Sequence, residues 1–221
     1  MKIVLKFGGT SVGSGKKIIN VCEIVQKVKK NNQVIVVSSA LQSTTDELLE
    51  LSENAKKGQV NKKIINDIVQ RHQDAIKDII QDKKIQDEVF EKVSSLIKEL
   101  EKTVEGVIIV KELSDKTRDK IVSFGERLAV PIISAKLRDM GIKSESFTGG
   151  EVGIMTDENF GNASPLMKVT QHNVKNNLSN LLEETVPVIT GFIGVTQQGD
   201  ISTIGRGGSD FSASLIGMCL S

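Results

Sequence analysis

The fold class is decided by two apolar runs, KIVLKF at Lys2–Phe7 and QVIVVS at Gln33–Ser38. Each run is short and continuous, as is typical of a buried strand. Between them, apolar residues recur at helical spacing over Lys16–Lys30, which predicts an amphipathic helix. A buried strand, a helix and a second buried strand in this order predict a parallel crossover, and therefore an α/β fold.

The middle of the chain has a different composition. Residues 45–104 are rich in Lys, Glu, Gln, Asp and Ile, which predicts two or three helices that form a long excursion from the sheet. The charged residues there are expected on solvated helix faces. Val107–Val110 has the composition of a strand, with a helical continuation as the alternative. Asp119–Leu137 predicts a helix with a kink or break at Pro131.

Strand signals return in the last third of the chain. The predicted elements are strands at Ile142–Phe147, Val152–Thr156 and Pro187–Thr190, a short helix over Val174–Glu184, a hairpin over Gly191–Gly205 and a helix over Ser209–Leu220. Ser209 is the expected N-cap of that last helix. The sequence contains no repeat and no flexible linker, so one domain over residues 1–221 is expected.

Charge and hydropathy exclude several classes of protein. The 221 residues include 29 Lys and Arg against 28 Asp and Glu, and a net charge of +1 argues against nucleic acid as the main partner. No stretch approaches the roughly 18 apolar residues of a membrane helix, so no membrane partner is expected. Trp and Tyr are absent, which disfavours recognition of bases or sugars by stacking.

The cysteines and histidines suggest no special chemistry. Cys22 and Cys219 cannot form a disulfide framework, so a cytoplasmic protein is expected in which both residues pack in the interior. His72 and His172 are isolated and are expected at the surface. Neither a zinc site nor a catalytic triad is indicated, and no metal ligand is predicted.

The first candidate site follows the first strand, in the segment KFGGTS. Lys6 stands at the carboxyl end of the strand, where open α/β sheets bind ligands. Gly8 and Gly9 would let the backbone approach a phosphate and donate N–H groups to it. The segment matches neither the Walker A loop nor the dinucleotide-binding GxGxxG pattern. A simple tight turn is the alternative interpretation.

The second candidate site is GRGGSD at residues 205–210. Arg206 among glycines at a helix start would present a bidentate guanidinium beside backbone donors, which suits a carboxylate or a phosphate. Asp210 in the first helical turn is also explained by the helix dipole alone. Three glycines within four residues cost conformational entropy, which favours a binding site.

Two weaker candidates lie between these segments. Glu126 occurs in the otherwise apolar stretch SFGERL, where it either pairs with Arg127 or another base at the surface, or faces a ligand. The segment SSALQSTTD places the hydroxyls of Ser39 and Thr45 after the second strand. Hydroxyls at such positions are also ordinary capping groups.

Taken in order, KFGGTSV, SSALQSTTD, SFGERL and TGFIG…STIGRGGSD resemble the aspartate kinases of the amino acid kinase family over the whole chain. The resemblance implies a three-layer αβα sandwich with a mainly parallel sheet. It also implies ATP-dependent phosphorylation of the β-carboxylate of L-aspartate to 4-phospho-L-aspartate, the first step toward lysine, threonine, methionine and isoleucine. A kinase for another amino acid is the alternative.

The resemblance also assigns roles to residues. Lys6 is expected to neutralise the transferring phosphoryl group, and Gly8 and Gly9 to bind phosphate oxygens of ATP, whose Mg²⁺ arrives with the nucleotide. Arg206 would hold the α-carboxylate of aspartate, and Glu126 and Asp210 its ammonium. The implied aspartate-binding set is Ser39, Thr45, Glu126, Phe192, Arg206, Ser209 and Asp210. Because SSALQSTTD matches the family pattern loosely, the choice between Ser38 and Ser39 stays open.

Full-length members of the family contain more than this chain does. The resemblance implies further strands, a nucleotide-binding segment, ACT regulatory domains and a homo-oligomer, and residues 1–221 contain none of the additional segments. The fold is therefore expected to be C-terminally incomplete, and the chain to be the N-terminal, aspartate-binding part of the kinase domain. The alternative activity is a fragment that binds aspartate without turnover of its own.

Overall fold

The computed structural model describes residues 1–205 and 207–221. Its centre is a four-stranded sheet in which every neighbouring pair of strands is parallel. In spatial order the strands are β1 (Lys2–Phe7), β2 (Gln33–Ser38), β5 (Val186–Thr190) and β3 (Ser144–Phe147). The bounds of β1 and β2 are those predicted from the sequence, and the α/β class is confirmed.

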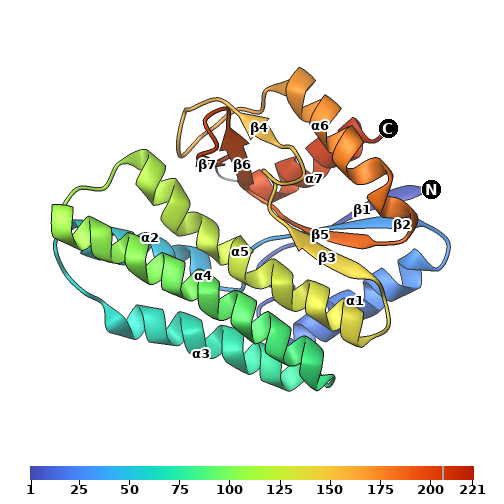
Figure 1. Ribbon diagram of the computed structural model, residues 1–221, viewed down its shortest axis with the longest axis horizontal. Coiled ribbons are helices and arrows are strands. Elements are labelled where there is room, and N and C mark those ends of the chain that lie inside the picture. Colours follow the sequence, from blue (N-terminus) through green and yellow to red (C-terminus); the bar gives the residue numbers. More distant parts are fainter. Residues whose placement is uncertain (206) are drawn as a thin grey trace.

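Helices cover both faces of this sheet (Figure 1). One face is covered by α1 (Gly15–Lys29) and α5 (Asp115–Asp139), and the other by α6 (Met167–Ser179) and α7 (Gly208–Cys219). The predicted mainly parallel αβα sandwich is therefore confirmed.

Strand β2 shows why the sheet needs cover on both faces. Its side chains alternate between the faces, as in any strand. Val34 and Val36 belong to the core under α1 and α5, whereas Ile35 and Val37 belong to the core under α6 and α7. All four side chains are fully buried, so a strand that reads as continuously apolar serves two separate cores.

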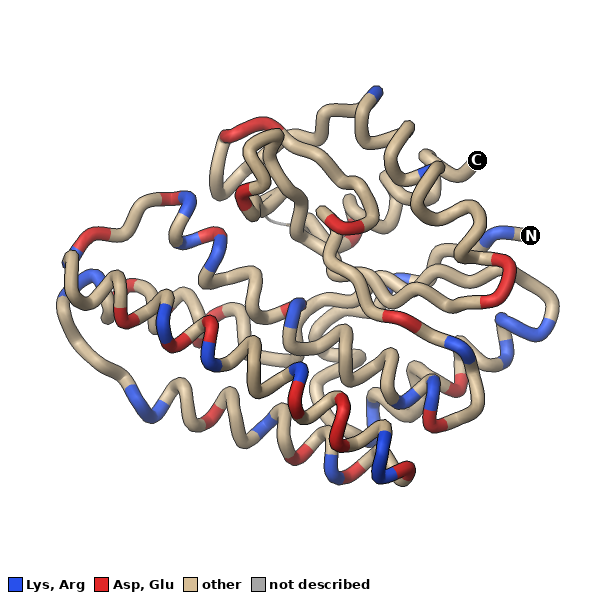
Figure 2. The backbone as a smooth tube through the Cα atoms, in the orientation of Figure 1, with Lys and Arg blue, Asp and Glu red and all other residues tan. Residues whose placement is uncertain are grey.

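The middle of the chain forms three helices beside the sheet, as predicted. They are α2 (Thr44–Lys56), α3 (Lys62–Ile79) and α4 (Lys83–Val110). Acidic and basic residues are distributed along all three (Figure 2). The strand interpretation of Val107–Val110 is wrong, because α4 continues to Val110, and the N–H of Lys111 still donates to the carbonyl of Val107 at 2.8 Å in the helical pattern.

Helix α5 runs unbroken through Pro131, so the predicted break is absent. The helix is buried on nearly all sides around this residue, including Val130, Ile132 and Ile133. Tertiary packing, which supplies most helical stability in proteins, thus outweighs the hydrogen bond that proline removes.

The last third of the chain forms a second, three-stranded sheet and short helical elements. The small sheet consists of β4 (Met155–Thr156), β6 (Ile193–Thr196) and β7 (Ile201–Thr203), and η1 (Leu181–Glu183) is a 3₁₀ turn after α6. The antiparallel pair β6–β7 confirms the predicted hairpin. The strand expected at Val152–Thr156 is reduced to the two residues of β4, and the helix expected from Val174 begins at Met167 instead.

Two expectations about single residues are wrong. His72 is fully buried in α3 rather than at the surface, and burial lowers its pKa to about 4. The N-cap of α7 is Gly207, with a φ of 79°, and not Ser209. Cys22 and Cys219 are buried, as predicted. Within residues 1–205 and 207–221, no helix has the length and apolar character needed to cross a membrane.

Candidate functional site

A cavity of about 680 Å³ opens where β1 and β2 end and α7 begins. This is the edge at which open α/β sheets bind ligands. Eight of the residues predicted from the sequence line it, namely Lys6, Gly9, Ser39, Thr45, Glu126, Phe192, Ser209 and Asp210. Gly8 adjoins the cavity, since a Cβ there would lie 3.5 Å from Lys6 Nζ. Arg206 lies outside the described residues.

The loops after β1 and β2 pack directly on each other. The Ser39 N–H donates to the carbonyl of Phe7 at 3.0 Å, and a Cβ on Gly9 would lie 3.1 Å from the carbonyl oxygen of Ala40. Ser38 is fully buried below this contact, whereas Ser39 faces the cavity. Of the two serines, the geometry therefore favours Ser39 as a ligand-binding group.

Glu126 comes to the cavity from α5. A close contact makes this possible, because a Cβ on Gly125 would lie only 2.8 Å from Ala40 Cβ. Glu126 is 3% exposed, and among the described residues no group hydrogen-bonds its Oε2. Burial raises the pKa of Glu126 to about 8, partly offset by the backbone N–H of Ala40. A buried carboxyl with a free oxygen at a cavity wall is poised to meet a cation.

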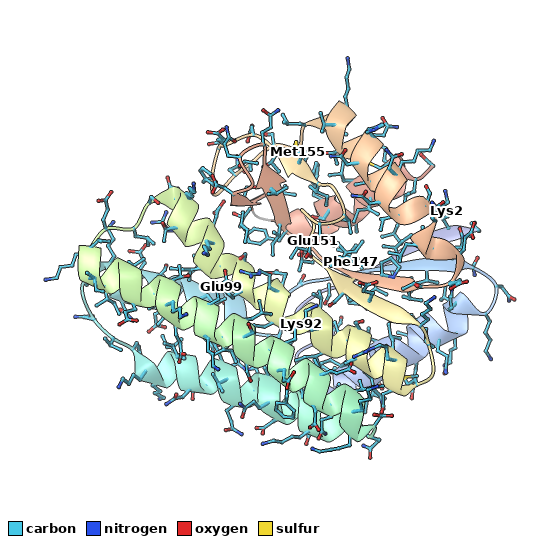
Figure 3. The ribbon with its side chains drawn as sticks, in the orientation of Figure 1. Lys2, Lys92, Glu99, Phe147, Glu151 and Met155 are labelled. Carbon is cyan, nitrogen blue, oxygen red and sulfur yellow. The ribbon has the colours of Figure 1, made fainter. Side chains whose placement is uncertain are left out.

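The neighbouring arginine does not neutralise Glu126. Arg127 Nη2 donates to Glu99 Oε2 on α4 at 2.6 Å, and its guanidinium lies 4.4 Å from the ring centroid of Phe124. Glu99 is labelled on α4 in Figure 3. The ion pair between Glu126 and Arg127 that was one sequence interpretation is therefore wrong, and the ligand-facing interpretation fits the geometry.

An ion pair forms part of the cavity wall. Lys6 Nζ lies 2.9 Å from Asp210 Oδ1, which joins the end of β1 to the first turn of α7. The Asp210 side chain is 72% exposed and that of Lys6 is 25% exposed, so both charges remain accessible to a ligand. The cavity thus presents one lysine and two carboxyl groups to whatever enters it.

The start of α7 is held unusually close to the end of β5. A Cβ on Gly191 would lie 2.6 Å from both Cβ and Oγ of Ser209, and a Cβ on Gly208 would lie 2.8 Å from the ring of Phe192. Phe192 itself has a φ of 66°, which is costly for a bulky side chain. Its N–H donates to Ser212 Oγ at 3.1 Å. These contacts fix Phe192 and Ser209 at the cavity wall.

Sequence reasoning missed several residues of the cavity wall. Gly161 lines it from the loop after β4, and the others line it from the β2–α2 connection (Leu41, Gln42 and Ser43) and from the first turns of α2 (Asp46 and Leu49). A single glycine in a polar loop gives no sequence signal for such a role. The φ of 69° at Ser43 is likewise invisible in the sequence. Among the described residues, no group of three or more His, Cys, Asp or Glu side chains is placed to hold a metal ion.

Comparison with known proteins identifies the class to which this fold and cavity belong. The amino acid kinase family matches the chain over residues 1–221, and the chain belongs to that family. Within it, the chain is 33% identical to aspartokinase 1, chloroplastic, of Arabidopsis thaliana, over 98% of this chain and 38% of the relative. It is 31% identical to the aspartokinase of Geobacillus stearothermophilus, over 96% and 38% of the two chains. The chain therefore spans about two fifths of the length of these relatives.

Solved structures give the same picture. Aspartokinase III of E. coli, in complex with aspartate and ADP, superposes with a TM-score of 0.88 at 25% identity, over 100% of this chain and 47% of that one. The aspartate kinase of Clostridium acetobutylicum shares the fold, with a TM-score of 0.77 at 23% identity, over 100% and 46% of the two chains.

Proposed function

We propose that the cavity binds L-aspartate, and that the chain is the amino-acid-binding part of a kinase that transfers the γ-phosphoryl group of ATP to the β-carboxylate. The observation that carries the proposal is Glu126, a buried carboxyl whose Oε2 accepts no hydrogen bond from any described residue, at the wall of a cavity that Lys6 also lines. An amino acid with an acidic side chain offers one ammonium and two carboxylates. Such a ligand complements two carboxyl groups and a lysine better than an uncharged one.

The residues of the wall suggest how aspartate would lie. Its ammonium would bind between Glu126 and Asp210, where Glu126 Oε2 has no hydrogen-bond partner among the described residues. The hydroxyls of Ser39, Thr45 and Ser209 would donate to its carboxylates, and Arg206 is assigned to the α-carboxylate from the family resemblance. Phe192 would close the apolar side of the pocket around the methylene group.

Phosphoryl transfer then needs little chemistry from the protein. The β-carboxylate is ionised at neutral pH and can attack without a general base. Catalysis is positioning together with neutralisation of charge on the transferring group. Lys6 would exchange its contact with Asp210 for that group, and the backbone N–H groups of Gly8 and Gly9 would approach the phosphate oxygens. The product is 4-phospho-L-aspartate, from which we infer a role at the start of lysine, threonine, methionine and isoleucine synthesis in the cytoplasm.

The nucleotide is proposed to bring its Mg²⁺ with it. The cation would neutralise phosphate oxygens, together with Lys6 and the backbone N–H groups of Gly8 and Gly9. Because the similar aspartokinases are more than twice as long, we propose that residues 1–221 form the N-terminal part of the kinase domain. We further propose that they do not turn over aspartate alone, and that the whole protein is a homo-oligomer.

An ATP-dependent hydroxamate assay tests the proposal. Aspartyl phosphate is trapped by hydroxylamine and detected as aspartyl hydroxamate, with L-glutamate as the control substrate. Aspartate binding in titration calorimetry, without turnover in the hydroxamate assay, supports the proposal for this chain. Turnover that is lost in Lys6→Met would show that the chain is itself a complete kinase. Neither binding nor turnover, or an equal response to L-glutamate, would contradict the proposed substrate.

A further inference from the structure

Asp119 is a buried carboxylate that lies outside the cavity. It belongs to α5 and is 3% exposed. Its Oδ2 accepts hydrogen bonds from the N–H of Gly161 at 2.9 Å and from the N–H of Thr203 at 2.7 Å. Its Oδ1 accepts a third from Thr203 Oγ1 at 2.8 Å. Buried charges are costly unless they are satisfied in this way, so the site has a specific architecture.

The two segments that bind Asp119 form one wall of the cavity. Gly161 lines the cavity itself, and Thr203 ends β7 two residues before Gly205, which also lines it. The segments also contact each other. The N–H of Ala163 donates to the carbonyl of Thr203 at 2.9 Å, and a Cβ on Gly205 would lie 2.6 Å from Asn162 Oδ1. Asp119 therefore sits at a junction of α5, the loop after β4 and the segment that leads into α7.

The position of Asp119 on α5 relates this junction to Glu126. The two residues are seven positions apart, close to two helical turns, and so lie on the same side of the helix. One rigid helix thus carries Glu126 into the cavity and, about 10 Å away along its axis, holds the wall formed by Gly161 and Gly205. A shift of that wall would change the distance between Glu126 and the residues that begin α7.

We propose that Asp119 is a positioning residue for the amino acid site: it fixes the wall formed by Gly161 and Gly205, and with it the start of α7, relative to Glu126. The inference rests on the proposed function of the cavity and adds to it a residue that touches no ligand. Without Asp119, three hydrogen-bond donors lose a charged acceptor, and the two segments separate from α5. Ser209 and Asp210 then no longer converge with Glu126 on one ligand.

The variant Asp119→Asn keeps the size of the side chain but replaces the charged carboxylate by a neutral amide, which has a single acceptor oxygen for two backbone N–H groups and a hydroxyl. Helix α5 also supplies a matched control. The side chain of Asp139, near the other end of the helix, is 5% exposed, and its Oδ2 pairs with Lys136 Nζ at 2.7 Å. Its Oδ1 accepts the backbone N–H groups of Gln81 and Asp82 at 2.9 and 2.8 Å. Asp139→Asn therefore also replaces a charged acceptor of two backbone N–H groups on α5 by a neutral one, at a position that does not line the cavity.

Two measurements are made on both variants of the chain. In titration calorimetry with L-aspartate, Asp119→Asn is expected to weaken binding at least tenfold, because the cavity wall loses its hydrogen bonds to a charged acceptor. Asp139→Asn is expected to change binding less than twofold. In amide hydrogen exchange, Asp119→Asn is expected to accelerate exchange in residues 157–165 and 200–205 selectively. Binding in Asp119→Asn within twofold of the unsubstituted chain overturns the proposal, as does equal weakening in the two variants.

The exchange measurement separates this proposal from the proposed function. If the unsubstituted chain binds no aspartate, the substrate assignment fails, and the exchange data still decide whether Asp119 holds the wall. Unchanged exchange in residues 157–165 and 200–205 of Asp119→Asn would overturn the positioning role in that case. Accelerated exchange confined to these segments would support it.

Discussion

Replacing Glu126 by glutamine should change how the stability of the chain depends on pH. Burial raises the pKa of Glu126 from its ordinary 4.5 to about 8. The folded chain without aspartate therefore keeps a proton that the unfolded chain releases near pH 4.5. The stability contributed by this proton is fully present below pH 4.5 and is lost as the pH rises through 8.

The magnitude follows from the two pKa values. At about 1.4 kcal/mol for each pKa unit, the raised pKa of Glu126 lowers the free energy of unfolding by about 5 kcal/mol as the pH rises from below 4.5 to above 8. About 3 kcal/mol of this decrease has occurred by pH 7. Glu126→Gln cannot ionise, so its free energy of unfolding should be nearly independent of this titration. The variant should therefore be more stable than the unsubstituted chain at pH 8, and the difference should shrink toward pH 5.

Urea unfolding followed by far-ultraviolet circular dichroism between pH 5 and 9 measures this difference, since the chain contains no Trp or Tyr for fluorescence. An aspartate ammonium beside Glu126 should lower its pKa, so that binding at pH 7 releases about one proton. Calorimetry in buffers of different ionisation enthalpy counts that proton. Parallel pH profiles for the two chains, together with no proton release, would refute the reasoning.

Three further predictions concern other residues. Burial lowers the pKa of His72 to about 4, so the stability that the neutral imidazole contributes is present above pH 6.5 and declines by about 3 kcal/mol as the pH falls to 4 and below. In urea titrations, His72→Leu should reduce this loss of stability at acid pH. An unchanged loss of stability in the variant would contradict the prediction. Gly191→Ala would place a Cβ 2.6 Å from Ser209, so it should lower the free energy of unfolding by about 1–3 kcal/mol and weaken aspartate binding in calorimetry. A variant with unchanged stability and unchanged binding would contradict this prediction. Gly106→Ala, near the C-terminal end of α4 where a Cβ meets nothing within 4 Å, should instead raise the melting temperature by adding about 0.5–1 kcal/mol to the stability. A lower melting temperature would contradict this.

Much of the fold was predictable because its signals are local. The apolar runs of β1 and β2 are each continuous in the sequence, and Gly8 and Gly9 follow β1 directly. The parallel arrangement follows from the order of strand, helix and strand. Glu126 was also visible, as a lone acid in an apolar stretch. The choice between a surface ion pair and a ligand-facing role was not, because it depends on Arg127 finding Glu99 on a different helix.

The incorrect and missing predictions have one physical cause: the structure at these residues depends on tertiary contacts. Val107–Val110 has strand composition, yet it extends a helix that packs on α5 and α2. His72 follows Arg71 in a polar sequence, but it lies on the inward face of α3. Asp119 gives no local signal either, since its partners Gly161 and Thr203 are 42 and 84 residues away.

Titration calorimetry of the chain with L-aspartate, with L-glutamate as the control ligand, tests the central claim most directly. The account predicts saturable heat for L-aspartate, much weaker heat for L-glutamate, and loss of the aspartate signal in Glu126→Ala. Equal heats for the two amino acids, or aspartate binding that survives in Glu126→Ala, would contradict the assignment of this cavity as an aspartate site.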